Sequence, residues 1–219
     1  MINEGKHRLA KPACRTWNDP MQHPDISSLP TRLSTVFRHI GSHGGRAWLV
    51  GGSVRDMLLG RIPKDFDIEV YGLDAAALLA AVQPLGRCEI VGRQFGVLQL
   101  WTDGLEIALA PPRTEIKPGA GHRAFMVQTD PGLDEQAASS RRDFTINAMM
   151  LDPLTKDLLD FHGGQRDLGQ GILRHVSPAF AEDPLRPLRG MQFAARFRLV
   201  MHAETAAMCR SLLGEAHSL

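Results

Sequence analysis

Hydrophobic and polar residues recur along the chain with two different periods, and these periods predict helices and strands in turn. Apolar residues return every three to four positions within residues 30–39, which predicts an amphipathic helix. Alternation with a period of two at residues 66–71 predicts a strand with one buried face. Short apolar runs at residues 47–50, 97–101 and 105–110 predict three further strands.

The remaining segments complete the pattern. Ser53 is expected to cap a helix that ends at Gly60. Proline and glycine at the start of residues 111–140, with little periodicity, predict a mobile loop. The other expected elements are helices at 74–83, 139–149 and from 181 onward, and strands at 150–151 and 158–161. The presence of both strands and helices along the chain favours an α/β fold.

Composition narrows the class of protein. With 43% hydrophobic and 22% charged residues, a chain of 219 residues can bury the core of one sizeable domain. The formal net charge is +1, so contact with nucleic acid would have to come from local patches. Cys14, Cys88 and Cys209 form no CxxC pair, which disfavours a zinc knuckle or a disulfide framework and fits a reducing compartment. No apolar run approaches membrane-spanning length, so we expect a cytoplasmic protein without membrane contact.

Two aspartates stand in the segment KDFDIE. Residues two apart in a strand point to the same face, so Asp65 and Asp67 are expected to project together. Mg²⁺ prefers one or two carboxylates together with water and substrate phosphates. Taken alone, the pair is a weak signal, because most such pairs belong to a solvated strand face.

Neighbouring residues favour the metal site. Gly51, Gly52 and Ser53 at a strand-to-helix turn would permit close approach of a phosphate, although a tight turn also explains the glycines. Arg55 would reach phosphate oxygens or form a surface ion pair. Glu106, between apolar neighbours on a later strand, is a candidate third carboxylate or an ordinary exposed residue.

The order of these parts resembles the catalytic core of the DNA polymerase β-like nucleotidyltransferases, which implies an α/β fold with a small mixed sheet flanked by helices. Four segments narrow the resemblance: LVGGSVRDMLLGRIPKDFDIEVYG, RRDFTINAMMLD, DFHGGQRDL and FAEDPLRPLRGMQFAARF. Together they are similar to the successive motifs of the bacterial and eukaryotic class (class II) of tRNA nucleotidyltransferases, which are CCA-adding enzymes grouped with bacterial poly(A) polymerases. The resemblance spans about residues 45–205.

The resemblance implies roles for individual residues. Asp65 and Asp67 would hold two Mg²⁺ ions, with Glu106 as a further catalytic carboxylate, and the phosphate-binding turn would comprise Gly51, Gly52, Ser53 and Arg55. Arg141, Arg142 and Asp143 would engage the phosphates and ribose of CTP or ATP, and Asn147 would line the same pocket. A salt-bridge cluster at a helix start is the structural alternative for these last residues.

Asp183 and Arg186 would bind the Watson–Crick edge of the incoming base. A carboxylate accepts from the exocyclic amino group that cytosine and adenine share, while a guanidinium donates to the neighbouring acceptor. The structural alternative is a capped helix start with Pro184 at its first position. Pro187 is expected to restrict the backbone of Arg186 away from the helical conformation. Residues 110–112 are interpreted as a small insertion.

Members of this class are longer than this chain and hold tRNA with neck, body and tail regions. We therefore expect an N-terminal arm at 1–29, a nucleotidyltransferase head at 30–175 and a partial helical neck at 176–219, without body and tail. Residues 114–140 correspond in position to the flexible loop of CCA-adding relatives. A partner protein or an oligomer would supply the remaining RNA-binding surface.

The resemblance implies a template-independent transferase that adds CMP and AMP from CTP and ATP to the 3′ end of tRNA or another RNA. Three alternatives stay open within enzymes: an A-only, a C-only or a poly(A)-adding transferase. From another class comes a nucleotide-binding module that is inactive without a partner.

Overall fold

The computed structural model describes residues 24–91, 96–116 and 126–215. Most of the predicted arm, including Cys14, lies outside the described residues, as do Gly119 and Gly121 of the predicted loop. The described chain opens with a 3-10 turn, η1 (Ile26–Ser28), which precedes the first helix.

A seven-stranded mixed sheet forms the centre of the molecule, in the order β3-β4-β5-β2-β1-β8-β9. Its strands are β1 (Arg46–Val50), β2 (Phe66–Tyr71), β3 (Arg87–Val91), β4 (Val97–Thr102), β5 (Leu105–Ala110), β8 (Met150–Leu151) and β9 (Leu158–Leu159). Strands β2 and β5 run parallel, and every other neighbouring pair is antiparallel. This confirms the predicted mixed sheet; the existence of β3, however, had no signal in the apolar pattern.

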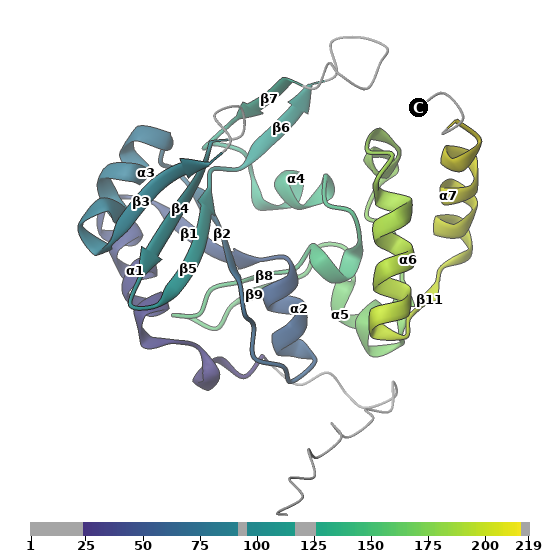
Figure 1. Ribbon diagram of the computed structural model, residues 1–219, viewed down its shortest axis with the longest axis horizontal. Helices are drawn as coiled ribbons and strands as arrows, with labels where there is room; N and C mark the ends of the chain where they lie inside the picture. Colours follow the sequence, from purple (N-terminus) through teal and green to yellow (C-terminus); the bar gives the residue numbers. More distant parts are fainter. Residues whose placement is uncertain (1–23, 92–95, 117–125, 216–219) are drawn as a thin grey trace, which may run out of the picture.

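Two helices, α1 (Thr31–Ser42) and α3 (Ala75–Val82), pack together at one end of the sheet (Figure 1). As its periodicity predicts, α1 buries an apolar stripe: Leu33, Val36, Phe37 and Ile40. The Asp74 carboxylate accepts a hydrogen bond from the Ala77 amide at 2.8 Å and so fixes the start of α3. These helices close the main hydrophobic core against one face of the sheet.

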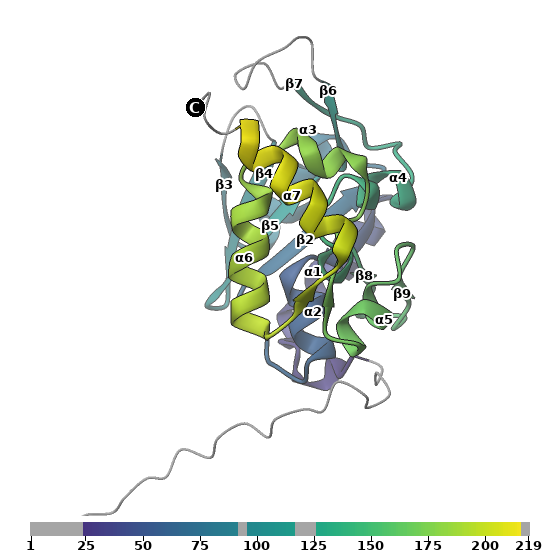
Figure 2. The ribbon, with the colours of Figure 1, turned by 90° about the vertical axis from the view of Figure 1, so that its right-hand side faces the viewer.

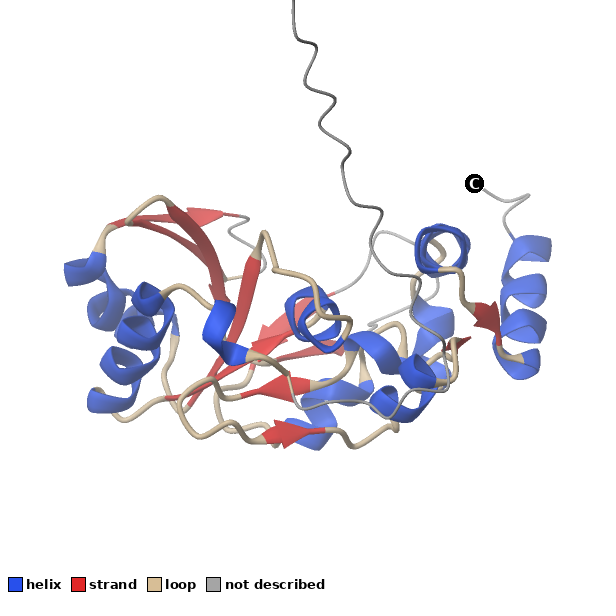
Figure 3. Cartoon of the chain, turned by 90° about the horizontal axis from the view of Figure 1, so that it is seen from below, coloured by secondary structure: helices blue, strands red, loops and turns tan. Residues whose placement is uncertain are grey.

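The opposite end is helical, and apart from its first helix its elements follow β5 in the sequence. It contains α2 (Gly52–Leu58), α4 (Glu135–Ser140), η3 (Thr145–Asn147), α5 (Gly164–Gly169), η4 (Pro178–Glu182), α6 (Arg186–Phe197) and α7 (Ala203–Glu215). Helices α6 and α7 lie side by side at the edge of the molecule (Figures 1 and 2). Seen from below, they stand at the far side from α1 and α3 (Figure 3). A small parallel pair, β10 (Ile172–Leu173) with β11 (Val200–Met201), packs against α5 and α6 at this helical end.

Several sequence predictions are wrong in detail. The predicted loop at 111–140 contains an antiparallel hairpin, β6 (Arg113–Ile116) with β7 (Met126–Thr129), followed by α4. The helix predicted at 139–149 is instead the end of α4, a turn and η3. Asp134 caps α4 through a 2.7 Å bond to Ala137, so this helix begins earlier than its apolar pattern indicated.

The helical segment predicted from residue 181 is largely observed, but it is not one continuous helix. It is divided into α6 and α7, because Arg198 takes a left-handed conformation at the end of α6 and β11 follows. The turn predicted at Gly163 is present, with φ of 72°. Among the described residues, no helix is both long enough and apolar enough to cross a membrane.

Candidate active site

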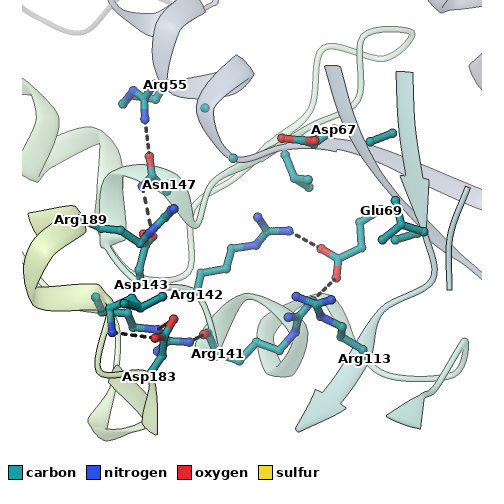
Figure 4. A pocket seen from close by; sticks show the side chains of 18 of the residues that line it. Arg55, Asp67, Glu69, Arg113, Arg141, Arg142, Asp143, Asn147, Asp183 and Arg189 are labelled. Carbon is teal, nitrogen blue, oxygen red and sulfur yellow. Dashed lines mark hydrogen bonds and ion pairs between the residues drawn. The ribbon is translucent and has the colours of Figure 1, made fainter. Parts of the chain in front are cut away.

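A pocket of about 950 Å³ opens between the sheet and the helical end of the molecule (Figure 4). The sheet supplies one wall through β2 and β5, and the start of α2, the α4–η3 turn and the start of α6 supply the others. Ten of the thirteen predicted site residues line it: Gly51, Gly52, Arg55, Asp67, Arg141, Arg142, Asp143, Asn147, Asp183 and Arg186. Ser53, Asp65 and Glu106 do not.

The glycine pair gives the pocket a bare stretch of backbone. Gly51 has φ of 72°, a conformation that favours glycine, and it caps the start of α2. A Cβ atom at Gly51 would stand 3.7 Å from both Asp67 Oδ2 and Arg142 Nη1. The turn therefore brings backbone, a carboxylate and a guanidinium together in one corner.

Ser53 does not have the predicted capping role. Gly51 is the capping residue, and Ser53 lies within the helix with 4% of its surface exposed. Its hydroxyl donates a 2.8 Å hydrogen bond to the Val50 carbonyl, which ties β1 to α2. The side chain is therefore committed to the turn and is not directed at a ligand.

Arg55 lines the pocket but its guanidinium is held by the protein. It donates to Asn147 Oδ1 at 2.7 Å and to Asp56 Oδ1 at 2.8 Å, and it is 4% exposed. Its guanidinium carbon lies 4.3 Å from the ring centroid of Phe197. Burial lowers the pKa of Arg55, with Asp56 opposing this change. Arg55 thus links α2, η3 and α6, and the surface ion pair considered from the sequence is instead a buried one.

Asp67 projects into the pocket from β2. Burial by the surrounding wall raises the pKa of its carboxyl, Arg142 opposes this, and the charge of Asp65 adds to it. Asp65 precedes β2 and is exposed. The two carboxylates supply an oxygen donor set that suits Mg²⁺, so the residues fit the predicted ion.

Glu106 stands near this pair without joining the pocket wall. Asp67 pairs with Ala108 in the parallel register, and Glu106 lies two residues earlier on the same face of β5. Its side chain is exposed. Within residues 24–91, 96–116 and 126–215, no group of three His, Cys, Asp or Glu side chains is arranged to hold a metal ion.

Glu69, which was not predicted, organises the cationic wall. It is 3% exposed and accepts hydrogen bonds from Arg141 Nη2 at 3.2 Å and from Arg142 Nη2 at 2.5 Å (Figure 4). Burial alone would raise the pKa of Glu69, but the two guanidiniums outweigh it, so the pKa lies below its ordinary value. The signal in the sequence was its spacing: Glu69 shares a strand face with Asp67.

Asp143 and Asn147 form a second polar wall. Asp143 Oδ1 accepts from Asn147 Nδ2 at 3.1 Å, and Asn147 accepts from Arg55, which makes a continuous chain of hydrogen bonds (Figure 4). Arg189 donates to Asp143 Oδ2 at 2.9 Å through Nε and lines the same pocket. Arg189 was not among the predicted site residues, although it follows Arg186 by about one helical turn.

Asp183 and Arg186, the predicted base-binding pair, lie at the start of α6. Arg186 is 7% exposed and donates to the carbonyls of Ala179 at 2.9 Å and Arg141 at 2.8 Å. Its Nε stands 3.9 Å from Asp183, whose carboxylate caps Leu185 at 2.8 Å and remains partly exposed. The structure therefore brings the pair together.

Pro187 does not have the predicted effect on Arg186. The helix α6 begins at Arg186, with the proline in its first turn. At that position the missing proline N–H would have had no helical partner, so the ring is accommodated. The diproline before Arg113 joins β5 directly to β6, and Arg113 also lines the pocket.

Comparison with known proteins shows that the chain is similar to members of one enzyme family. The family model described as poly A polymerase head domain matches residues 47–174. The multifunctional CCA proteins of Xylella fastidiosa (strain M12) and Neisseria meningitidis serogroup C (strain 053442) are each 46% identical, over 179 and 177 residues. Each match covers 80% of this chain, and 41% and 40% of the relatives, so the chain spans about two fifths of their length.

Solved structures share the architecture. The Thermotoga maritima CCA-adding enzyme complexed with tRNA superposes with a TM-score of 0.68 at 30% identity, over 87% of this chain and 44% of that enzyme. The Bacillus stearothermophilus CCA-adding enzyme in complex with CTP gives 0.67 at 25% identity, over 81% and 42%. The mixed sheet with flanking helices is therefore the head fold of these enzymes.

Proposed function

The chain belongs to the poly A polymerase head-domain family of CCA-adding-type nucleotidyltransferases, and from this membership and its pocket we propose that it transfers CMP and AMP from CTP and ATP to the 3′ end of tRNA. One observation carries the proposal. The bare backbone at Gly51 stands beside the carboxylate of Asp67 and the guanidinium of Arg142. A nucleotidyl transfer needs these three elements together: a metal ligand, a cation for phosphate oxygens and room for the phosphates.

Asp65 and Asp67 would hold Mg²⁺, with Glu106 as a nearby third carboxylate. Bound there, the ions would activate the acceptor 3′-hydroxyl and stabilise the leaving pyrophosphate. The register of β2 with β5 supports the role of Glu106, because it places this residue on the face of the aspartates. Substituting Glu106 with glutamine tests this role. A lower kcat would support Glu106 as the third carboxylate, whereas an unchanged kcat would mean that Glu106 is an ordinary exposed strand residue.

Different side chains of the pocket would bind the phosphates and the ribose of the nucleotide. Arg141 and Arg142, already held by Glu69, would bind the phosphates, and their fixed orientation spares the reorganisation that mobile side chains would need. Asp143 would accept from a ribose hydroxyl, beside Asn147 in the same wall. These contacts involve phosphate and sugar, which every nucleoside triphosphate carries, so they bind without selecting the base.

Base choice would depend on Asp183 and Arg186. The partly exposed Asp183 carboxylate accepts from an exocyclic amino group, which cytosine and adenine both carry. Arg186 is anchored on two backbone carbonyls, so its position relative to Asp183 is fixed before a base arrives. Uracil and guanine would present a carbonyl to the carboxylate and be excluded.

The test is incorporation. The chain is incubated with tRNA lacking its 3′ CCA, MgCl₂ and labelled CTP or ATP, beside the double variant Asp65→Ala/Asp67→Ala. We expect both labels to enter, in the order C, C, A, and none in the variant. Entry of only one label would replace the proposal with a single-nucleotide or poly(A)-adding transferase. Binding of CTP without incorporation at high tRNA concentration would make the chain a nucleotide-binding module.

A further inference from the structure

Three arginines, of which only Arg55 lines the pocket, converge on one buried ring. The guanidinium carbons of Arg55, Arg61 and Arg196 lie 4.3, 5.2 and 5.1 Å from the centroid of Phe197. Phe197 is 4% exposed and ends α6, whereas Arg61 follows the end of α2. We call Arg61 and Arg196, together on the Phe197 ring, the guanidinium pair.

The charges of the guanidinium pair are not neutralised by the described part of the protein. Arg55 has the Asp56 carboxylate, but among the described residues neither Arg61 nor Arg196 forms an ion pair with Asp or Glu. Both side chains are exposed. The charge of Arg196 also opposes the protonated state of Arg55. Cations that repel one another at one place form a site with a net demand for an anion.

The guanidinium pair lies close to the carboxylates but outside the pocket. Arg61 precedes Asp65 by four residues, so their Cα atoms are at most about 14 Å apart. The pocket wall includes Arg55 and Phe193 but neither member of the pair. The contacts of Arg55 and Arg61 with the Phe197 ring connect α2 and the residues after it to the end of α6. The residues that line the pocket would therefore bind a nucleoside triphosphate. The guanidinium pair lies outside that pocket and would bind a second anion.

We propose that Arg61 and Arg196 hold backbone phosphates of the acceptor RNA as its 3′ end enters beside Asp65. The inference rests on the proposed function, which requires an RNA 3′ end at the carboxylates. Phe197 is buried, so it supports the guanidiniums and offers no face for stacking with a base. The contact therefore binds phosphates irrespective of sequence.

The experiment measures RNA binding without catalysis. Fluorescence anisotropy with labelled tRNA lacking CCA, in the absence of nucleotides, is recorded between 50 and 200 mM KCl for the variant Arg61→Gln/Arg196→Gln. Because each phosphate contact to a single strand contributes about 0.7 to the slope of log K against log salt, losing two should lower the slope by about 1.4. The affinity should fall about tenfold at the lowest salt concentration.

Two further variants define the result. Arg38→Gln/Arg87→Gln removes the same charge from exposed positions on α1 and β3 and should bind RNA as the wild type does. Arg61→Lys/Arg196→Lys keeps the charge and should retain the wild-type slope. CTP affinity, measured by calorimetry, should be unchanged in all three, which also confirms that each is folded.

An unchanged slope in the glutamine variant, or an equal loss in the Arg38/Arg87 control, would overturn the assignment. The outcome is independent of the transferase activity, since binding is measured without nucleotide. If wild-type protein binds RNA but incorporates nothing, the proposed function fails and the guanidinium pair is still tested.

Discussion

The two faces of strand β2 consist of six consecutive residues but are held in place in different ways. Phe66, Ile68 and Val70 point into the main hydrophobic core, where burial alone fixes them. On the other face, Asp67 and Glu69 lie on the pocket side, and Glu69 is held by arginines from a segment about seventy residues later. One face stabilises the fold, and the other carries charges whose positions depend on distant partners.

The largest difference between the faces should appear on Asp67→Asn. This change removes one charged ligand for Mg²⁺ but keeps the size of the side chain, so activity should fall at least about 1000-fold. The free energy of unfolding, measured by urea titration without Mg²⁺, should stay within about 1 kcal/mol of wild type, because an exposed carboxylate near Asp65 contributes little to folding. A large loss of stability would mean that this face supports the fold.

The opposite result is expected for the core. Leu33 is fully buried on α1, and Leu33→Ala should lower the free energy of unfolding by about 2–5 kcal/mol through lost contacts and a cavity. The affinity of the remaining folded protein for CTP, measured by calorimetry at low temperature, should not change. Weaker CTP binding in that folded fraction would show that the core also sets the pocket.

Glu69 lies at the boundary between the two behaviours, since it is buried and yet serves the pocket. Glu69→Gln removes the buried carboxylate that both guanidiniums contact, and because each arginine side chain is only about one fifth exposed, stability should fall by about 2 kcal/mol. The arginines remain able to bind phosphate but lose their fixed orientation. We therefore expect kcat to fall about tenfold, with a smaller change in CTP affinity.

A matched control for Glu69 is Glu89→Gln. Glu89 forms an exposed ion pair with Arg87, so its loss should change stability by less than about 1 kcal/mol and leave kcat unaltered. If Glu69→Gln behaves in the same way, the arginines do not depend on the buried carboxylate.

The same contrast explains what the sequence could predict. Period-two alternation located β2, and the periodicity of α1 identified its buried stripe, because burial leaves a local pattern. The pairing of Glu69 with Arg141 and Arg142 leaves no local pattern, since it joins residues far apart in the chain. The order of the resembling segments indicated most of the pocket wall, but Arg189 and Glu69 required the fold.

Other errors have similar causes. Serine is a common capping residue, but Gly51, with φ of 72°, takes this position in place of Ser53, so the helix begins two residues earlier than predicted. The hairpin β6–β7 follows two prolines, and its pairing is non-local, so the segment had the composition of a loop. Arg198 ends α6 in a left-handed conformation that glycine usually supplies.

The smallest expected effect is a pH dependence of stability. It comes from His175, which contacts Thr205 of α7. Burial lowers the pKa of His175, with Glu204 opposing and His202 and Arg174 assisting; its Nδ1 lies 2.8 Å from the Thr205 hydroxyl. In the unfolded chain the same imidazole titrates near pH 6.5, so the unfolded state binds more protons below that pH. Its contribution to stability is therefore complete above about pH 6.5 and is lost as the pH falls through the lower folded pKa.

Urea titrations between pH 5 and 7.5 measure this dependence. His175 is only partly buried, so the change should stay below about 1 kcal/mol. In His175→Gln, which can still hydrogen-bond Thr205 but does not titrate, the loss of stability on acidification should be smaller than in wild type. An identical pH profile in the variant would assign the acid sensitivity to other groups, of which His162 is the next candidate because burial lowers its pKa as well.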